Sequence, residues 1–194
     1  EEKMKVKTIS ALLADPTDYI LELFSCLHNS NPNSIHFRRT RNYIELSSDG
    51  QAWNADEINE LMSAFFIRLD DESPLCKRYG QLATAVYSAF NTQATELTIE
   101  SNNGKEPIKY TVRKVKDENT RKQKVRAVRF GDNTVSFEQS HETSLKRGTR
   151  IRVYKQGKRK MSKLLHSPIT KLFSAPTTPE ANKIQQYCNF SLTP

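Results

Sequence analysis

Apolar residues recur at helical spacing near the start of the chain. One stripe, with steps of three and four residues, predicts a helix and consists of Ile20, Leu23, Phe24 and Leu27. Asp15 is the expected N-cap of this helix and Pro16 its first residue. Asn31-Pro32 should end it. A neighbouring stripe of the same helix carries three polar side chains, Glu22, Cys26 and Asn29.

Two strands and two further helices are expected next. Residues 34–38 and 43–46 alternate as strands do, and a basic turn joins them. Asn54 and Glu57 form a capping box for a helix. Its apolar face would be Ile58, Leu61, Met62, Phe65 and Phe66. After a polar loop at 70–74, a helix rich in small residues should run from Gly80 to about Phe90.

The second half of the chain is rich in β-branched residues and predicts five strands. These cover residues 95–100, 108–115, 124–130, 134–137 and 149–154. Asn102-Asn103-Gly104 and Gly131-Asp132-Asn133 are turn signals between them. The pattern fades after Lys155, so we expect residues 1–155 to be one domain and 156–194 to be a basic exit segment or linker. One helix is expected in that segment, near residues 180–188.

Length and cysteine content narrow the class of protein. With 194 residues the chain fits one domain, and it contains no run of 18 apolar residues that would predict a membrane partner. Cys26, Cys76 and Cys188 are odd in number and unpaired in spacing, which favours a reducing, cytoplasmic setting and argues against zinc. Because residue 1 is not methionine, the chain is expected to belong to a longer protein, with further domains or protein partners.

The net charge of +8 is divided unevenly along the chain. Residues 1–100 carry 9 basic and 15 acidic side chains, whereas residues 101–194 carry 21 basic and 7 acidic ones. Such asymmetry is typical of a surface that binds DNA or RNA, although a solvated lysine-rich face gives the same pattern. The candidate nucleic-acid-binding residues are Lys146, Arg147, Arg150, Arg152, Lys158, Arg159 and Lys160. Alternation along 149–154 puts Arg150 and Arg152 on one face of a strand.

The order of motifs resembles the GHKL ATP-binding fold of gyrase B subunits, MutL-type proteins, heat-shock-90-type chaperones and sensor histidine kinases. An acidic helix, a strand pair, an Asp-Gly turn, a glycine-entered helix and a late Gly-Thr strand follow one another over roughly residues 10–155. The resemblance implies a two-layer α/β sandwich of the Bergerat type. A mixed β-sheet would form one layer, with about three helices on one face.

The first family motif places a glutamate and an asparagine one turn apart on the opening helix. In the family the glutamate is the general base that activates water, and the asparagine binds magnesium. Glu22 matches the glutamate, Cys26 takes the place of the asparagine, and Asn29 falls in the residue pair that follows. A thiol is a poor ligand for a hard cation. Without the resemblance, Glu22 would be taken as a surface glutamate.

The second motif carries the adenine-binding aspartate and two glycines. Here Ser48 stands at the aspartate position and Ala52 at the second glycine, with Asp49 and Gly50 between them. Asp49 is one residue late, so on a strand its side chain should point to the opposite face. It could serve if the turn were shifted by one residue. An ordinary Asp-Gly turn explains the same letters.

The third and fourth motifs are a glycine-rich helix start that holds phosphates and a Gly-Thr strand entry. Gly80 resembles the end of the third motif in MutL-type proteins, with Lys77 at an earlier glycine position. Gly148-Thr149 matches the fourth, where the threonine hydroxyl supports the adenine-binding aspartate. The resemblance thus assigns nucleotide contacts to Cys26, Asn29, Ser48, Asp49, Gly50, Lys77, Gly80 and Thr149.

Three functions remain open from the sequence. In the first, the chain is an ATPase-like domain of a larger protein with at most weak ATP binding or hydrolysis, and ATP and magnesium are the candidate cofactors. Alternatively, it is a catalytically dead module that serves as an interaction platform, or a basic module that associates with DNA or RNA. No Walker loop, Gly-x-Ser-x-Gly elbow or His-Glu-x-x-His motif supports another enzyme class.

Overall fold

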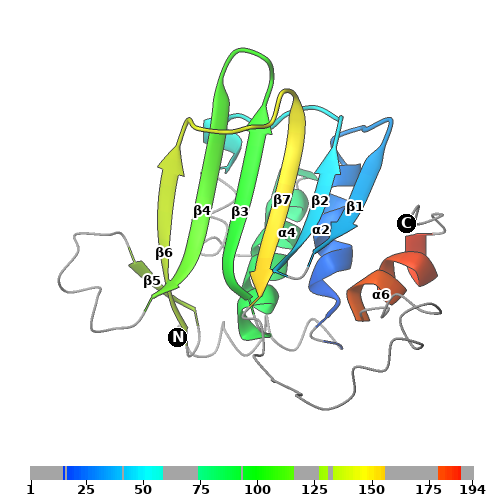
Figure 1. Cartoon of the computed structure of the whole chain (residues 1–194), viewed down its shortest axis with the longest axis vertical. Helices are drawn as coiled ribbons and strands as arrows, with labels where there is room; N and C mark the ends of the chain where they lie inside the picture. Colours follow the sequence, from blue (N-terminus) through cyan, green and yellow to red (C-terminus); the bar gives the residue numbers. More distant parts are fainter. Residues whose placement is uncertain are drawn as a thin grey trace, which may run out of the picture.

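The computed structural model is a mixed α/β structure. It describes residues 15, 17–40, 42–58, 74–92, 94–115, 127–130, 133–155 and 179–188. Seven strands form one sheet in the order β1-β2-β7-β3-β4-β6-β5 (Figure 1). Their bounds are β1 Ile35–Arg39, β2 Tyr43–Ser48, β3 Ala94–Asn102, β4 Pro107–Val115, β5 Ala127–Phe130, β6 Asn133–Ser140 and β7 Gly148–Lys155.

Every pair of neighbouring strands in the described sheet is antiparallel, so the expectation of a mixed sheet was wrong. The reason lies in the connections. Hairpins join β1 to β2, β3 to β4 and β5 to β6, and these give antiparallel neighbours directly. The last strand, β7, then enters between β2 and β3 and runs against both of them. It is therefore flanked by strands on both sides.

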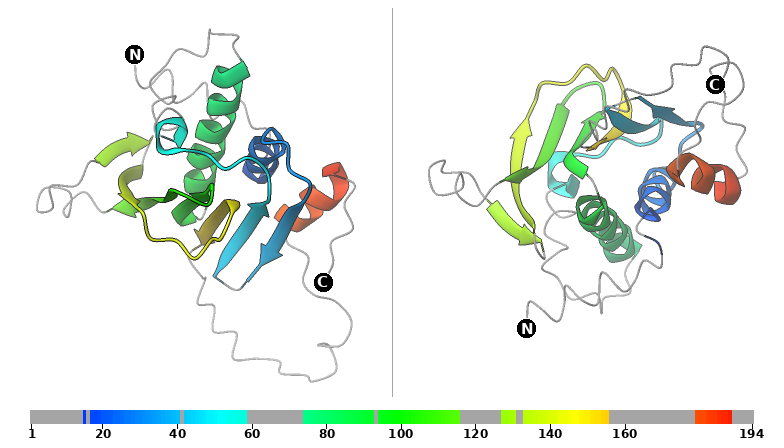
Figure 2. Two further views of the ribbon diagram at one scale, coloured as in Figure 1. Left: turned by 90° about the horizontal axis from the view of Figure 1, so that it is seen from above. Right: turned by 60° about the horizontal axis from the view of Figure 1, so that its bottom comes forward.

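Helices α2 (Tyr19–His28) and α4 (Pro74–Asn91) lie on one face of the sheet, and α6 (Pro179–Cys188) lies beside α2 (Figure 2). The helix expected near 180–188 is therefore present, and it packs against the domain. No helix among the described residues is both long and apolar enough to cross a membrane.

Helix α4 begins at Pro74, six residues before the expected start at Gly80. Proline fits the first turn of a helix because its φ is already helical and its missing N–H has no partner there. The sequence pattern predicts instead that Pro74 belongs to a loop and that the helix begins at Gly80. In the structure Gly80 lies within the helix.

The start of α2 also differs from expectation. The helix begins at Tyr19, with Asp18 rather than Asp15 at the N-cap position. The Asp15 carboxylate instead accepts hydrogen bonds from the Thr17 backbone N–H (2.8 Å) and hydroxyl (2.7 Å), which builds a turn before the helix. The pKa of Asp15 is lowered to about 2, first by the Thr17 backbone bond, then by the Thr17 hydroxyl and by Lys183.

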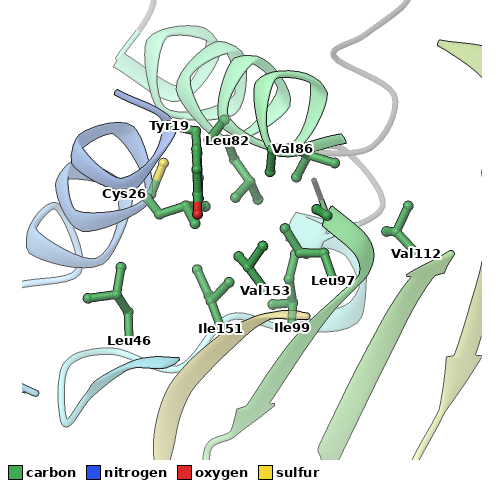
Figure 3. Packing of buried hydrophobic residues seen from close by; sticks show 14 of the residues in the cluster. Tyr19, Cys26, Leu46, Leu82, Val86, Leu97, Ile99, Val112, Ile151 and Val153 are labelled. Carbon is green, nitrogen blue, oxygen red and sulfur yellow. The ribbon is translucent and has the colours of Figure 1, made fainter. Parts of the chain in front are cut away.

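The core lies between the sheet and the helices (Figure 3). The inward side chains of the central strands alternate with polar ones, as half-buried strands require. The core residues contributed by the sheet include Leu46, Leu97, Ile99, Val112, Ile151 and Val153, and those from the helices include Leu23, Leu27, Leu82, Val86 and Phe90. Burial of each large side chain contributes about 1.5–3 kcal/mol.

The second expected helix is described only at its start. Asn54 and Glu57 form the capping box: the Asn54 N–H donates to the Glu57 carboxylate (2.9 Å) and the Glu57 N–H donates to Asn54 Oδ1 (2.8 Å). Residues 55–58 are helical and Ile58 is buried. The rest of the predicted apolar face, from Leu61 to Phe66, lies outside the described residues.

Candidate functional site

The end of β2 and the start of β7 meet beneath the helix layer. Ser48 and Thr149 are partners in the antiparallel register, and both side chains are buried. Ser48 follows Leu46 and Ile44 in the alternation of β2, so it points to the same side as these core residues. The position that resembles the adenine-binding aspartate is therefore occupied by a buried serine beside the threonine of the Gly-Thr pair.

Gly148 makes the close approach of these two strands feasible. Its φ is +91°, a backbone conformation that side-chain-bearing residues rarely adopt. A Cβ atom at this position would lie 2.1 Å from the backbone carbonyl oxygen of Ser48. Only glycine fits here, which gives the Gly-Thr pair a structural reason that is independent of any ligand.

A chain of hydrogen bonds connects Thr149 to the loop after α2. The hydroxyl groups of Thr149 and Ser101 are 3.2 Å apart, and Ser101 Oγ accepts the Trp53 backbone N–H at 2.7 Å. The Trp53 indole N–H donates to Ser30 Oγ at 2.9 Å. All four residues are buried. Their polar groups therefore bond to one another in the region next to Ser48.

Trp53, Ser30 and Ser101 were not among the residues singled out from the sequence. The one available signal was that the chain has a single tryptophan and that it lies three residues after Gly50 of the Ser-Asp-Gly turn. Ser101 was not recognisable because it lies 48 positions from both Trp53 and Thr149. Only the pairing of β3 with β7 brings it to this place.

The Asp-Gly turn packs against the end of α2. A Cβ on Gly50 would lie 2.6 Å from the Ser30 carbonyl oxygen, and the Gln51 N–H donates to the same oxygen at 2.8 Å. Ser48 Oγ accepts the Gly50 N–H at 3.2 Å. Gly50 thus allows the turn and the helix end to approach each other.

Asp49 points away from Ser48, as its place in the alternation predicts. It is exposed, and its carboxylate accepts the Ser34 backbone N–H at 2.9 Å and the Ser34 hydroxyl at 3.1 Å. The hydrogen bond from the Ser34 backbone lowers the pKa of Asp49. The carboxylate thus joins the end of β2 to the start of β1.

Glu22 lies on α2 and is half-buried. Burial raises the pKa of its carboxyl group, and the nearby charge of Asp18 raises it further. A raised pKa suits a general base.

The remaining positions on α2 differ in exposure. Cys26, at the position where the resemblance would place a metal ligand, is 0 % exposed and belongs to the core cluster (Figure 3). Asn29 is exposed at the C-terminal end of the helix. A buried thiol within the core offers a hard cation neither an oxygen ligand nor room for its water shell.

The two candidate phosphate contacts on α4 differ in their distance from the helix start. Lys77 is the fourth residue of α4, at the end of its first turn, whereas Gly80 lies in the second turn, where backbone N–H groups bond to the preceding turn. The anion-binding property of a helix N-terminus belongs to the first turn, which here is at Pro74.

The candidate nucleic-acid-binding residues separate into three groups. Arg150 and Arg152 form ion pairs: Arg150 Nη2 lies 2.5 Å from Glu100, and Arg152 lies 2.5 Å from Glu45 and 3.1 Å from Glu100. Lys146 and Arg147 are exposed in the loop before β7. The third group, Lys158, Arg159 and Lys160, lies outside the described residues.

Glu100 is the centre of this charged network on the sheet face that points away from α2 and α4. Its side chain is 4 % exposed, and Thr143 also donates a hydrogen bond to it. Burial by itself would raise the pKa of Glu100, but the bonds from Thr143 and Arg150 outweigh burial and lower it. The two β7 arginines are therefore neutralised within the protein.

Comparison of the chain with protein-family models and with curated proteins finds no match.

Proposed function

We propose that this chain is a GHKL-type, ATPase-like domain of a larger protein, with a damaged nucleotide site that binds ATP weakly at best. In this proposal the domain acts chiefly as an interaction platform. In this proposal the chain keeps the two layers of sheet and helices, with an antiparallel sheet in place of the mixed one that the resemblance implies, and has lost the contacts that hold magnesium ATP.

The order of the elements supports the kinship. A helix bearing Glu22 precedes the β1–β2 pair, which ends at Ser48, and α4 leads into β3. The Gly148-Thr149 pair then brings a threonine next to Ser48 in the register of β2 and β7. This neighbourhood is what the resemblance implies for the adenine-binding position and its supporting threonine.

The main support for a loss of ATP binding comes from the hydrogen bonds of Thr149 and Ser48. Its hydroxyl faces Ser101, which already accepts the Trp53 backbone N–H. Ser48 Oγ, in turn, accepts a bond from Gly50. An adenine amino group would therefore find a neutral, engaged hydroxyl where the family has a carboxylate, and hydrogen bonds to charged groups are roughly twice as strong.

The metal position supports the same reading. Cys26 is buried in the core, so magnesium would have to bind without the side chain that links it to the phosphates in the family. Glu22 is the residue that could still activate water, because it is half-buried and the pKa of its carboxyl group is raised. Slow hydrolysis of ATP is therefore the secondary part of the proposal.

Isothermal titration calorimetry with ATP, with and without magnesium, tests the proposal. We expect no saturation at micromolar ATP and no effect of magnesium. The matched test is the repaired variant Cys26→Asn/Ser48→Asp, for which we expect no gain in affinity because Trp53, Ser30 and Ser101 fill the neighbouring region with their own bonds. Micromolar, magnesium-dependent binding by the unmodified chain would contradict the proposal.

A further inference from the structure

Helix α6 packs against the domain, although a long stretch of sequence separates it from β7. Residues 156–178, 23 in all, separate β7 from α6 in the sequence. Yet Lys155, the last residue of β7, forms an ion pair with Glu180 in the first turn of α6. In Figure 2 α6 lies beside α2. The chain therefore returns to the place from which it left the sheet.

The first turn of α6 is held by a buried carboxylate. The Glu180 side chain is 2 % exposed, and it accepts a hydrogen bond from the Tyr19 hydroxyl at 3.3 Å in addition to its ion pair with Lys155. The Lys155 ammonium also lies 5.7 Å from the centre of the Tyr19 ring. Tyr19 and Lys155 belong to α2 and β7, so Glu180 joins the helix to both.

The next turn of α6 has the opposite charge. Lys183 Nζ lies 3.2 Å from Asp15 and 2.5 Å from Asp18, the two acidic residues before α2. Ile184, the following residue, is 2 % exposed and belongs to the core cluster. The opposite side of α6 carries the exposed residues Asn182 and Gln186. Tyr187 follows on the same stripe as Lys183, whose Nζ lies 5.9 Å from the centre of its ring, and it is 63 % exposed.

We propose that the surface formed by Tyr19, Lys155, Asp15 and Asp18 is a docking site for a short helix. Such a helix carries a carboxylate in its first turn, an ammonium group one turn later and an aliphatic side chain beside it. Helix α6 of the same chain is the releasable occupant of this site. The spacing Glu180, Lys183, Ile184 places all three groups on one side of a helix. This inference does not depend on nucleotide binding.

Two features point to release rather than to permanent packing. Among the described side chains of α6, the core cluster includes the single aliphatic residue Ile184, and the contact also uses a set of ion pairs. Ion pairs that involve partly exposed side chains, such as those of Lys183, weaken as salt rises. The strands of the sheet pair with one another and α2 packs against α4 without α6, whose described share of the core cluster is Ile184. Detachment would expose the start of α2, the helix that carries Glu22.

Hydrogen exchange of the full chain, followed by mass spectrometry, tests the docking site. In the variant Lys183→Glu, repulsion from Asp15 and Asp18 should free α6, so that its amides exchange at least tenfold faster, together with those at the start of α2. Amides of β3 and β7 should keep their protection. The control Gln186→Glu adds negative charge on the exposed side of the same helix and should leave exchange unchanged.

The double variant Lys183→Glu/Asp18→Lys restores opposite charges and should return α6 to slow exchange. Unchanged α6 exchange in Lys183→Glu would overturn the proposal, as would failure of the double variant to restore protection. Faster exchange throughout β3 and β7 would also overturn it, because α6 would then be an integral part of the fold.

Discussion

Gly148 lies so close to Ser48 that a single added carbon would overlap the Ser48 carbonyl oxygen, at 2.1 Å. This contact fixes the spacing between β2 and β7 at the point where Thr149 enters the core. The steric need for glycine therefore falls on the Gly-Thr pair that resembles the fourth GHKL motif.

Gly148→Ala should be severely destabilising. The positive φ alone costs about 1–2 kcal/mol for an alanine, and the overlap with backbone adds to it because the carbonyl of a paired strand cannot move away. The matched control is Gly104→Ala, since Gly104 has the same φ of +91° and nothing within 4 Å of the new Cβ. Urea unfolding of both variants separates the cost of the positive φ from the cost of the overlap with the backbone. Equal losses would mean that the clash is relieved at no cost.

Ser101→Ala should destabilise the protein by about 1–3 kcal/mol, because it leaves the buried Trp53 N–H without an acceptor. It should also change the environment of Trp53, the single tryptophan, so the fluorescence of the folded state gives an independent readout. Ser47→Ala, on the opposite face of β2, is the control and should do neither. A Ser101→Ala variant as stable as this control would show that water replaces the lost group.

Glu100→Gln should reduce stability at neutral pH by about 3–5 kcal/mol, because two arginines lose their shared buried partner. The folded-state pKa of Glu100 is lowered, so its contribution is present above the unfolded pKa and is lost as pH falls through the folded pKa. Unfolding free energies measured from pH 7 downwards should therefore decline below about pH 4.3, and less steeply in Glu100→Gln. Parallel curves for the two proteins would contradict this.

Glu22→Gln should have the opposite sign. Burial raises the folded-state pKa of Glu22, so its ionised form opposes folding above that pKa and the opposition disappears once both states are protonated. We expect the variant to be slightly more stable at pH 7, by less than about 1 kcal/mol given its partial exposure, and equal to the unmodified protein near pH 3. Thermal unfolding at the two pH values measures this difference. A variant less stable at pH 7 would assign Glu22 a structural bond.

The strands were predictable because period-two alternation is a local property. The expected strand at 108–115 corresponds to β4 at Pro107–Val115, and the expected 149–154 to β7 at Gly148–Lys155. The inward position of Ser48 and the outward one of Asp49 also follow from alternation. Strand direction was not predictable, since it depends on where β7 inserts in the sheet.

The charged network around Glu100 shows why the candidate site was harder to predict from the sequence than the fold. Arg152 is 107 positions from Glu45 and 52 from Glu100, so no local pattern indicates that its charge is neutralised. Arg150 and Arg152 therefore add little to a basic surface on the described part of the chain. Whether the domain contacts DNA or RNA then depends on Lys146, Arg147 and the three basic residues at 158–160.

The position of β7 has a consequence for synthesis on the ribosome. Of the described strands, β7 is synthesised last, and it separates β2 from β3. Without β7, the strands described in residues 1–147 form two incomplete pieces of sheet whose facing edges are unpaired. Unpaired strand edges are the surfaces through which chains associate wrongly. The nascent domain therefore has to wait for its final strand, and any truncation before residue 155 should yield a product that aggregates rather than a smaller stable fold.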